Sequence, residues 1–374
     1  MTETSAIHPA VSVIVPARNE EACLAACLES LVQQNGVPFE IIVVNDQSTD
    51  RTREIACSSS SSPAQNQVRV IDAAPLPAGW TGKNNAVTTG ARTARGEWLL
   101  FTDADTFHLP GSLARSLEEA HRHGAAMLSY SPEQTVKSFW EKAVMPVIFA
   151  ELAISFRPSR VSDPYSPAAA ANGQYILITR EAYDAVGGHA TIAGNLLEDV
   201  ALACAVKRSG RKIFFRFGAD AVRTRMYRTF DQLREGWTKN LALLFPSPLR
   251  LAILRAVEFF LIVASFTISA VNLLRGHWQS AAVTATLGAI LNSLFLTRIR
   301  RAHFSWGANV IALFGLPLFS YLLLRSKMFH QRGNVSWKGR TYSGGVGTSE
   351  TMNVFQEKAL GPGERQAEKA FTGN

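Results

Sequence analysis

The sequence predicts an α/β fold in which a mostly parallel sheet is flanked by helices, followed by a helical membrane region. Short apolar runs alternate with helical stretches from Val11 to about Val222, a pattern typical of parallel strands covered on both faces. Three longer apolar runs follow, at 256–274, 278–297 and 306–324. The chain has 374 residues, 47% of them hydrophobic, which is enough for a sizeable core in one large domain or two modest ones.

The region from Val11 to about Val222 is expected to contain strands and the helices that connect them. The expected strands are 11–16, 39–44, 67–71, 98–102, 127–131, 172–179 and 212–217. The expected helices are 20–34, 49–57, 82–94, 139–156, 180–186 and 196–209. The serine-rich run 58–62 is interpreted as a flexible loop. The helix at 139–156 is largely apolar but is interrupted by charged residues and a proline, so we expect it to be buried or interfacial rather than spanning.

The most informative residues are Asp103 and Asp105, which follow the apolar run that ends at Thr102. Residues i and i+2 of a strand point the same way, so two carboxylates at a strand end can converge on one divalent cation. Mg²⁺ and Mn²⁺ prefer oxygen ligands and commonly share them with a substrate diphosphate. An acidic surface turn would give the same pattern, so the neighbouring segments must decide between the two interpretations.

Four further polar segments follow predicted strands or begin predicted helices. Ligands of open α/β sheets bind outside the carboxyl ends of the strands, where these segments are expected to meet. A lysine behind a glycine at a helix start suits a phosphate, although no Walker pattern surrounds it here. Acidic residues at helix starts have an alternative role as caps. The candidates are Pro16 and Glu20, Asp46, Lys83, and the pair Glu198 and Asp199.

Composition narrows the choice of partner and compartment. The formal net charge of +8 at pH 7 suits nucleic acid, an anionic membrane surface or an anionic substrate. Much of the basic excess flanks the apolar runs after Arg223, which favours the membrane. No zinc finger or RNA-binding signature supports nucleic acid. The N-terminus has no signal-peptide pattern, and the four cysteines form no metal-site pattern. We therefore expect the first two thirds of the chain to be cytosolic.

Each of the three C-terminal apolar runs is long enough to cross a bilayer core, which takes about 20 residues. Tryptophans stand at the starts of the second and third runs, where interfacial anchors are common. Three buried helices of a soluble domain are the alternative. If the N-terminal region is cytosolic, the loop at 275–277 lies outside and the basic loop at 298–303 lies inside, as the positive-inside tendency requires.

The third run does not fit the same rule. Three full crossings would place the basic residues between Arg325 and Arg340 outside, against the positive-inside tendency. Gly315 and Pro317 lie within this run, so a broken or re-entrant helix is a second possibility. The sequence leaves the number of crossings open.

From about Val11 to Leu243, the order and spacing of these motifs resemble the family-2 glycosyltransferases, which have the GT-A fold. The resemblance rests on segments 15–21 and 45–50, on the Asp-x-Asp at 103–105 and on the acidic pair at 198–199. Asn45 stands where the family more often has an acid. The family's Gln-x-x-Arg-Trp motif is replaced by Gln232-Leu233-Arg234-Glu235-Gly236-Trp237.

The resemblance implies a role for each candidate residue. Asp103 and Asp105 would bind a divalent metal, Mg²⁺ or Mn²⁺, and Asp199 would be the catalytic base. A nucleotide-sugar donor would contact Pro16, Glu20, Asp46, Lys83 and Asp103. The residues on the acceptor or diphosphate side would be Glu198, Arg225, Arg228 and Trp237. Lipid headgroups are an equal alternative for the two arginines.

Segments 77–83, 225–228 and 337–340 are similar to motifs of hopanoid-associated and carotenoid-type glycosyltransferases. This resemblance implies an inverting transferase, expected to move a hexose from a nucleotide sugar to a lipid or isoprenoid hydroxyl at the cytosolic face of the cell (inner) membrane. The expected organisation is a cytosolic GT-A domain at 1–228, an amphipathic interfacial segment at 229–250, about three transmembrane helices at 251–330, and a basic, then disordered, tail at 331–374.

Two other functions remain open at this stage. A processive polysaccharide synthase belongs to the same class but normally has a channel and the standard Gln-x-x-Arg-Trp motif. A non-catalytic scaffold that binds nucleotide sugars would share the same motifs, and only transfer or donor hydrolysis by the purified protein separates it from an enzyme. A nucleotidyltransferase also uses paired carboxylates and a metal, but the Glu198-Asp199 segment does not suit it.

Overall fold

The computed structural model describes residues 9–60 and 68–342, which form two compact units. Unit 1 contains residues up to Gln134 together with Phe156–Arg225, and unit 2 contains Thr135–Ser155 together with Met226–Gly344. The helix at 139–155 therefore interrupts unit 1 in the sequence but belongs to unit 2, a division that differs from the contiguous 1–228 expected from the sequence. The expected tail from 343 onward lies outside the described residues.

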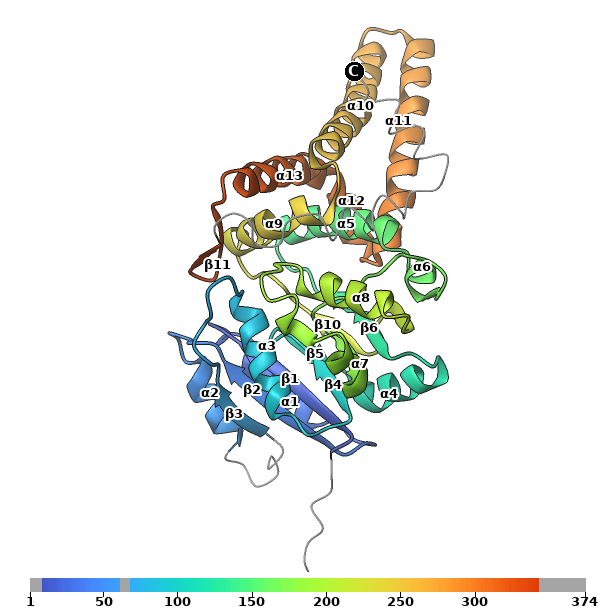
Figure 1. Cartoon of the computed structure of the whole chain (residues 1–374). Coiled ribbons are helices and arrows are strands. Elements are labelled where there is room, and N and C mark those ends of the chain that lie inside the picture. The colour runs from blue at the N-terminus through green and yellow to red at the C-terminus, as the bar shows by residue number, and fades with distance from the viewer. Residues whose placement is uncertain (1–8, 61–67, 343–374) are drawn as a thin grey trace, which may run out of the picture. The chain divides into compact units, whose positions relative to one another are not determined.

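Unit 1 is built on a seven-stranded sheet of order β3-β2-β1-β4-β8-β6-β9 (Figure 1). Its strands are β1 (Val11–Ala17), β2 (Phe39–Asn45), β3 (Val68–Asp72), β4 (Trp98–Phe101), β6 (Met127–Ser131), β8 (Ile176–Thr179) and β9 (Ile213–Phe217). All neighbours are parallel except β8, which is antiparallel to β4 and β6. The mostly parallel sheet predicted from the sequence is confirmed.

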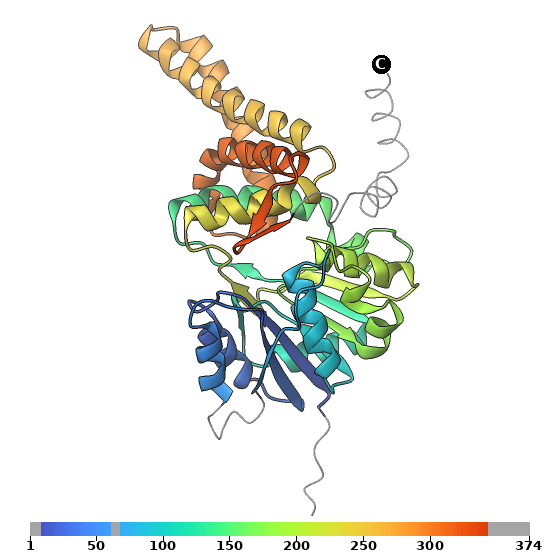
Figure 2. The ribbon, with the colours of Figure 1, turned by 60° about the vertical axis from the view of Figure 1, so that its left-hand side comes forward.

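Helices cover both faces of this sheet (Figure 2). Helices α1 (Leu24–Val32) and α2 (Thr52–Ser60) lie on one face and α3 (Gly82–Thr93) lies on the other. The central strands β1, β2 and β4 are almost fully buried, as strands of a sheet covered on both faces are. The α3 backbone approaches β1 and β2 closely, since a Cβ on Gly90 would come within 2.6 Å of the Ile14 side chain. Unit 1 also contains α4 (Ser112–Arg122), α6 (Pro158–Ser162), α7 (Arg180–Ala185) and α8 (Glu198–Arg208).

A second sheet in unit 1 was not predicted. It has the order β5-β10-β7 and consists of β5 (Thr106–His108), β10 (Val222–Thr224) and β7 (Glu133–Gln134). These strands are two or three residues long, too short to give a period-two pattern in the sequence. Several predicted boundaries were also wrong, and the helix expected at 20–34 spans only Leu24–Val32. Residues 172–175 precede β8 rather than belong to it, and Ser58–Ser60 continue α2 rather than form a loop.

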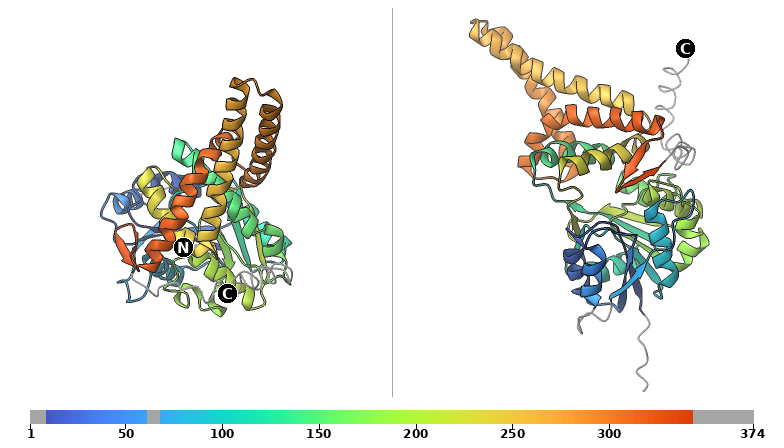
Figure 3. Two further views of the ribbon diagram at one scale, coloured as in Figure 1. Left: turned by 90° about the horizontal axis from the view of Figure 1, so that it is seen from above. Right: turned by 90° about the vertical axis from the view of Figure 1, so that its left-hand side faces the viewer.

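Unit 2 consists of helices and one small hairpin. Helices α5 (Phe139–Ser155) and α9 (Phe230–Leu244) precede a long helical hairpin made of α10 (Pro248–Leu274) and α11 (Trp278–Ile299) (Figure 3). The chain continues through η3 (Arg300–Ala302), α12 (Trp306–Ile311), η4 (Ala312–Phe314) and α13 (Gly315–Gln331). Strands β11 (Val335–Trp337) and β12 (Arg340–Tyr342) form the small β-hairpin.

Within the described residues, three helical segments are long and apolar enough to cross a membrane, namely Pro248–Leu274, Trp278–Ala302 and Trp306–Gln331. They match the three predicted apolar runs. The third is not a continuous α-helix, because the 3₁₀ turn η4 interrupts it just before Gly315. Pro317 falls in the first turn of α13, where its missing N–H leaves no hydrogen bond unmade.

Candidate active site

The carboxyl ends of three neighbouring strands bring together residues from distant parts of the sequence. Strand β1 pairs in parallel with both β2 and β4. Pro16 lies in β1, Asp46 follows β2 and is 4% exposed, and Asp103 lies just beyond β4. The sequence predicted this meeting of strand ends, and the structure places all three residues at the same edge of the sheet.

The turn that carries Asp103 and Asp105 is held by hydrogen bonds from both sides. Within the turn, the Thr106 N–H donates to the carbonyl of Asp103 at 3.2 Å. From β10, the hydroxyl of Thr224 donates to the carbonyl of Asp105, also at 3.2 Å. The second sheet therefore fixes the backbone of the Asp-x-Asp turn, so the positions of the two carboxylates depend little on a flexible loop.

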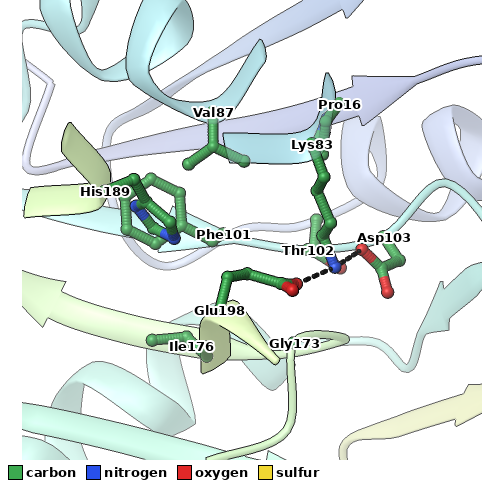
Figure 4. A pocket seen from close by; sticks show the side chains of 10 residues that line it. All are labelled: Pro16, Lys83, Val87, Phe101, Thr102, Asp103, Gly173, Ile176, His189 and Glu198. Atoms are coloured by element: carbon green, nitrogen blue, oxygen red, sulfur yellow. Dashed lines mark ion pairs between the residues drawn. The ribbon is translucent and has the colours of Figure 1, made fainter. Parts of the chain in front are cut away.

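Lys83 lies between the carboxylates of Asp103 and Glu198 (Figure 4). Its Nζ is 2.7 Å from Oδ1 of Asp103 and 2.6 Å from Oε1 of Glu198. Burial opposes the positive charge, but the two carboxylates outweigh it and raise the pKa of Lys83 well above its ordinary value. Helix α3 presents this lysine from its first turn, which is capped by the Thr81 hydroxyl accepting from the Asn84 N–H.

Asp199 differs from Glu198 in its surroundings. Its Oδ2 accepts a hydrogen bond from the Gly173 N–H at 3.0 Å, and its Oδ1 accepts one from the Val200 N–H at 2.8 Å. Burial and the negative charge of Glu198 nevertheless raise the pKa of Asp199 to about 6. A carboxyl group with a pKa near physiological pH is suited to accept a proton, as a general base must.

Gly173 is a site residue that the sequence did not indicate. A Cβ at this position would lie 3.0 Å from Nζ of Lys83, 3.2 Å from Oε1 of Glu198 and 3.6 Å from Oδ2 of Asp199. The missing side chain therefore leaves room for the lysine and both acids, while the backbone N–H orients Asp199. Glycine is the one residue that supplies this donor without a side chain in the site.

His189 was also missed by the sequence analysis. The imidazole is 2% exposed and lines a cavity that it shares with Lys83, Asp103 and Glu198 (Figure 4). Its Nδ1 is 3.0 Å from the hydroxyl of Tyr183, which also accepts the His189 backbone N–H at 3.1 Å. Gly188 has a φ of +55°, and a Cβ there would overlap the Tyr183 ring at 2.5 Å, so the glycine permits this pairing.

The Tyr183 oxygen accepts the backbone N–H of His189 and lies 3.0 Å from Nδ1 of the ring. We assign the tyrosine proton to this second contact, which puts the ring proton on Nε2, at the opposite edge of the ring. Burial lowers the pKa of His189 to about 4, so the ring is neutral at pH 7. A neutral hydrogen-bond donor is thus available in the cavity beside Glu198.

The Asp-x-Asp turn has the donor set expected of a site for a hard divalent cation. Burial raises the pKa of the neighbouring Cys27 thiol, and the charges of Asp105, Glu20 and Asp103 raise it further, so this edge of the sheet carries a concentrated negative potential. Within residues 9–60 and 68–342, no group of three or more His, Cys, Asp or Glu side chains could hold a metal. Carboxylate oxygens from Asp103 and Asp105 would therefore need phosphate oxygens or water to complete a coordination shell.

The remaining predicted residues belong to both units. Glu20 follows β1 and accepts from the Cys23 thiol at 3.2 Å, and Arg225 is the last described residue of unit 1. Arg228 and Trp237 belong to unit 2. The Trp237 side chain is 2% exposed, and its Nε1–H points to the sulfur of Met145 at 3.4 Å, so in this structure it packs the core of unit 2.

Known proteins resemble this chain over much of its length. The sequence profile described as glycosyl transferase family 2 matches residues 12–187. The chain is 30% identical over 348 residues to the 4,4'-diaponeurosporenoate glycosyltransferase of Staphylococcus aureus (strain MRSA252), a match that covers 90% of this chain and 89% of that protein. The chain belongs to glycosyltransferase family 2. The corresponding protein of strain USA300 is 29% identical over the same coverage.

A solved structure supports the fold of this family-2 glycosyltransferase. The mannosyltransferase PcManGT from Pyrobaculum calidifontis, in complex with GDP-Man and Mn²⁺, matches with a TM-score of 0.52 and 18% identity over 87% of each chain. The predicted resemblance to family 2 and the predicted GT-A fold are both confirmed. The roles of the individual site residues stay predictions.

The first prediction concerns Asp199. Its raised pKa means that the base form is lost as the pH falls through about 6, so we expect kcat/KM to fall at acid pH. A cation bound at the Asp-x-Asp turn would lower this pKa and move the fall to lower pH. Replacing Asp199 with Asn should reduce kcat by about 10²- to 10⁴-fold, which is the usual contribution of a general base. It should also remove the acid limb of the pH profile, that is, the fall of kcat/KM at acid pH. Binding of the donor should persist. Steady-state kinetics and calorimetry measure the two effects.

The control is Asp231→Asn on α9, which removes the same charge from a side chain that is 80% exposed. It should leave kcat and the pH profile unchanged. If Asp199→Asn turned over normally, or kept the acid limb, Asp199 would not be the base.

The second prediction concerns the Nε2–H of His189. Replacement by Gln keeps an N–H donor at the position of Nε2, whereas replacement by Leu removes it. We expect His189→Leu to lower kcat/KM by about tenfold, the effect of one lost hydrogen bond to a charged or reacting group, and His189→Gln to restore most of the loss. Equal losses in both variants, with unchanged thermal stability, would contradict the donor assignment.

Proposed function

We propose that the protein is an inverting glycosyltransferase that moves a sugar from a nucleotide sugar to a lipid or isoprenoid acceptor at the cytosolic face of a membrane. One observation carries the proposal. Lys83 bridges Asp103, at the end of β4, and Glu198, which precedes Asp199 at the start of α8. The carboxylate that would face a diphosphate is thus held next to the carboxylates that would face the reacting sugar and the acceptor.

The proposed reaction requires one proton transfer and one bond exchange. The acceptor hydroxyl attacks the anomeric carbon and gives its proton to a carboxylate oxygen of Asp199. The bond between the anomeric carbon and the phosphate oxygen breaks, and the nucleoside diphosphate leaves with the electron pair. Attack opposite to the leaving group inverts the anomeric configuration. Gly173 and Val200 orient Asp199 for this step through their N–H groups.

Charge develops on the leaving diphosphate, and the site has cationic groups to meet it. A divalent cation held by Asp103 and Asp105 would neutralise that charge when bound. Lys83 would add a second positive charge, since its ammonium already contacts Asp103. Pro16, Glu20 and Asp46, at the ends of β1 and β2, are proposed to bind the nucleoside. The mannosyltransferase of similar fold that was crystallised with GDP-Man and Mn²⁺ supports the proposal of a nucleotide sugar and a metal.

The chemical class of the acceptor can be tested more sharply. The Staphylococcus aureus relative is named for diaponeurosporenoate, and that ending denotes a carboxylate. A carboxylate is ionised at neutral pH and needs no base, whereas a hydroxyl does. Two backbone N–H groups hold the Asp199 carboxylate in the position proposed for a base, so we propose a hydroxyl acceptor for this chain.

The third prediction tests the function in cells. Lipid extracts from cells that express the protein should contain a hexose-bearing lipid that is missing from cells without it and from cells with the Asp199→Asn variant, as measured by mass spectrometry. A scaffold without activity would leave both extracts alike, and an aqueous polysaccharide in place of the lipid would indicate a synthase. Release of the free hexose from the product by mild alkaline hydrolysis would indicate a glycosyl ester, and therefore a carboxylate acceptor.

The fourth prediction tests the metal. Asp103→Ala removes one of the two carboxylates of the turn, so the affinity for a nucleoside diphosphate should no longer increase when Mn²⁺ is added, as measured by calorimetry. Glu29→Ala, which removes an exposed carboxylate from α1, is the control and should keep the full response to Mn²⁺. A preserved response in Asp103→Ala would refute the coordination proposal without affecting the role of Asp199.

A further inference from the structure

We propose that two of the three apolar helical segments, α10 and α11, cross the bilayer as a hairpin. The third, α12 to α13, lies along the membrane surface on the side of the catalytic unit. This proposal rests on the membrane association in the proposed function but not on glycosyl transfer. It follows from the chain connections of α5 and α9 and from the contacts of α13 within unit 2.

Helix α5 cannot have its ends on opposite sides of a bilayer. It is joined to β7 of unit 1 by residues 135–138 and to α6 of unit 1 by residues 156–157. A linker of four residues spans at most about 18 Å, whereas a bilayer core is about 30 Å thick. Both ends of α5 therefore remain on the side that contains unit 1.

Helix α9 begins on the same side. Residues 225–229 separate it from β10, and five residues reach at most about 22 Å. Its 15 residues, Phe230–Leu244, span about 22 Å as a helix and contain several charged side chains, so α9 does not cross. Helices α5 and α9 thus mark the catalytic side within unit 2.

A network of four charges places the base of the hairpin against α5. On α10, Arg255 lies 3.0 Å from Glu151 of α5 and 2.8 Å from Glu258. On α11, Arg298 lies 2.8 Å from Glu258 and 3.5 Å from Glu151. The start of α10 and the end of α11 are therefore both on the catalytic side.

Beyond this network, the hairpin has the length and surface of a membrane insertion. The stretch from Phe259 to Leu274 covers about 24 Å and the stretch from Trp278 to Thr297 covers about 30 Å at 1.5 Å per residue. Large apolar side chains are exposed along both helices, among them Phe260 at 67%, Val283 at 69% and Leu294 at 64%. Inside the protein only 17% of each apolar window is buried, so lipid is the medium that would cover the rest.

The third segment has contacts of a different kind. Its apolar window is 50% buried inside the protein. At the start of α13, a Cβ on Gly315 would lie 1.9 Å from the backbone oxygen of Ala143 on α5. At its end, the Ser326 hydroxyl donates to the carbonyl of Thr238 on α9 at 2.6 Å, and Nε2 of His330 is 2.8 Å from the carbonyl of Lys239. Both ends of α13 therefore contact helices that stay on the catalytic side.

This arrangement removes the conflict in the distribution of basic residues. With two crossings, the basic loop at 298–303 and the basic residues from Arg325 to Arg340 lie on the same side, as the positive-inside tendency requires. Trp306, which is 60% exposed and stacks with Arg300 at 4.9 Å, then serves as an interfacial anchor rather than as the entrance of a third crossing.

The fifth prediction tests this topology with the full-length protein in intact spheroplasts. Three single substitutions introduce exposed thiols: His277→Cys in the hairpin loop, Ser336→Cys in β11, and Glu118→Cys on α4 as the catalytic-side control. Cys23 and Cys57 are replaced by alanine in all three variants. A membrane-impermeant maleimide should label His277→Cys in intact spheroplasts, and should label the other two only after permeabilisation.

Labelling of Ser336→Cys together with His277→Cys in intact spheroplasts would show three crossings and overturn the proposal. Protection of all three positions would show that the hairpin does not cross, which would also overturn it. As a second measurement on the otherwise unchanged chain, an epitope tag after Asn374 should be removed by protease in inverted vesicles but not in spheroplasts. Lipid glycosylation by the same cells is scored separately, so failure of the topology and failure of the proposed function remain distinguishable.

Discussion

The catalytic unit depends on one partly buried ammonium group. Lys83 contacts Asp103 and Glu198 at 2.7 and 2.6 Å, which joins the first turn of α3, the turn after β4 and the start of α8. Without that charge, the carboxylates of Asp103 and Glu198 would lose the positive partner that both of them contact. Asp199 is held instead by two backbone N–H groups, and burial together with the charge of Glu198 raises its pKa to about 6. The acids of the site thus differ in their neighbours.

Unit 2 uses ion pairs for a different purpose. Glu151, Arg255, Glu258 and Arg298 are 7–20% exposed and carry no net charge as a group. A buried network of this kind adds little stability compared with apolar packing, but removing one partner leaves an uncompensated charge and costs about 3–5 kcal/mol. Its value lies in specificity, since an apolar contact could slide along the helix whereas paired charges fix the register of α10 and α11 against α5.

Much of the fold and part of the site could be predicted from the sequence. Alternating apolar runs predicted the parallel sheet, and strand ends in such a sheet must meet, so Asp46, Asp103 and the Glu198 segment could be assigned to one edge. Gly173 and His189 could not be predicted, because their importance depends on which side chains lie beside them in space. Trp237 shows the reverse problem. A tryptophan on the apolar face of an amphipathic helix gives the same pattern whether it meets a substrate or a core, and here it is packed beside Met145.

The third apolar segment shows why hydropathy alone does not determine topology. Hydropathy measures how favourably a helix leaves water, and burial against protein satisfies that preference as well as burial in lipid does. The two cases are separated by covalent and polar constraints: the short linkers that hold both ends of α5, and the hydrogen bonds from Ser326 and His330 to α9. The same constraints suit an enzyme with two kinds of substrate. A charged nucleotide sugar would arrive from water and a lipid acceptor from the bilayer, and the chain is divided into one unit suited to each environment.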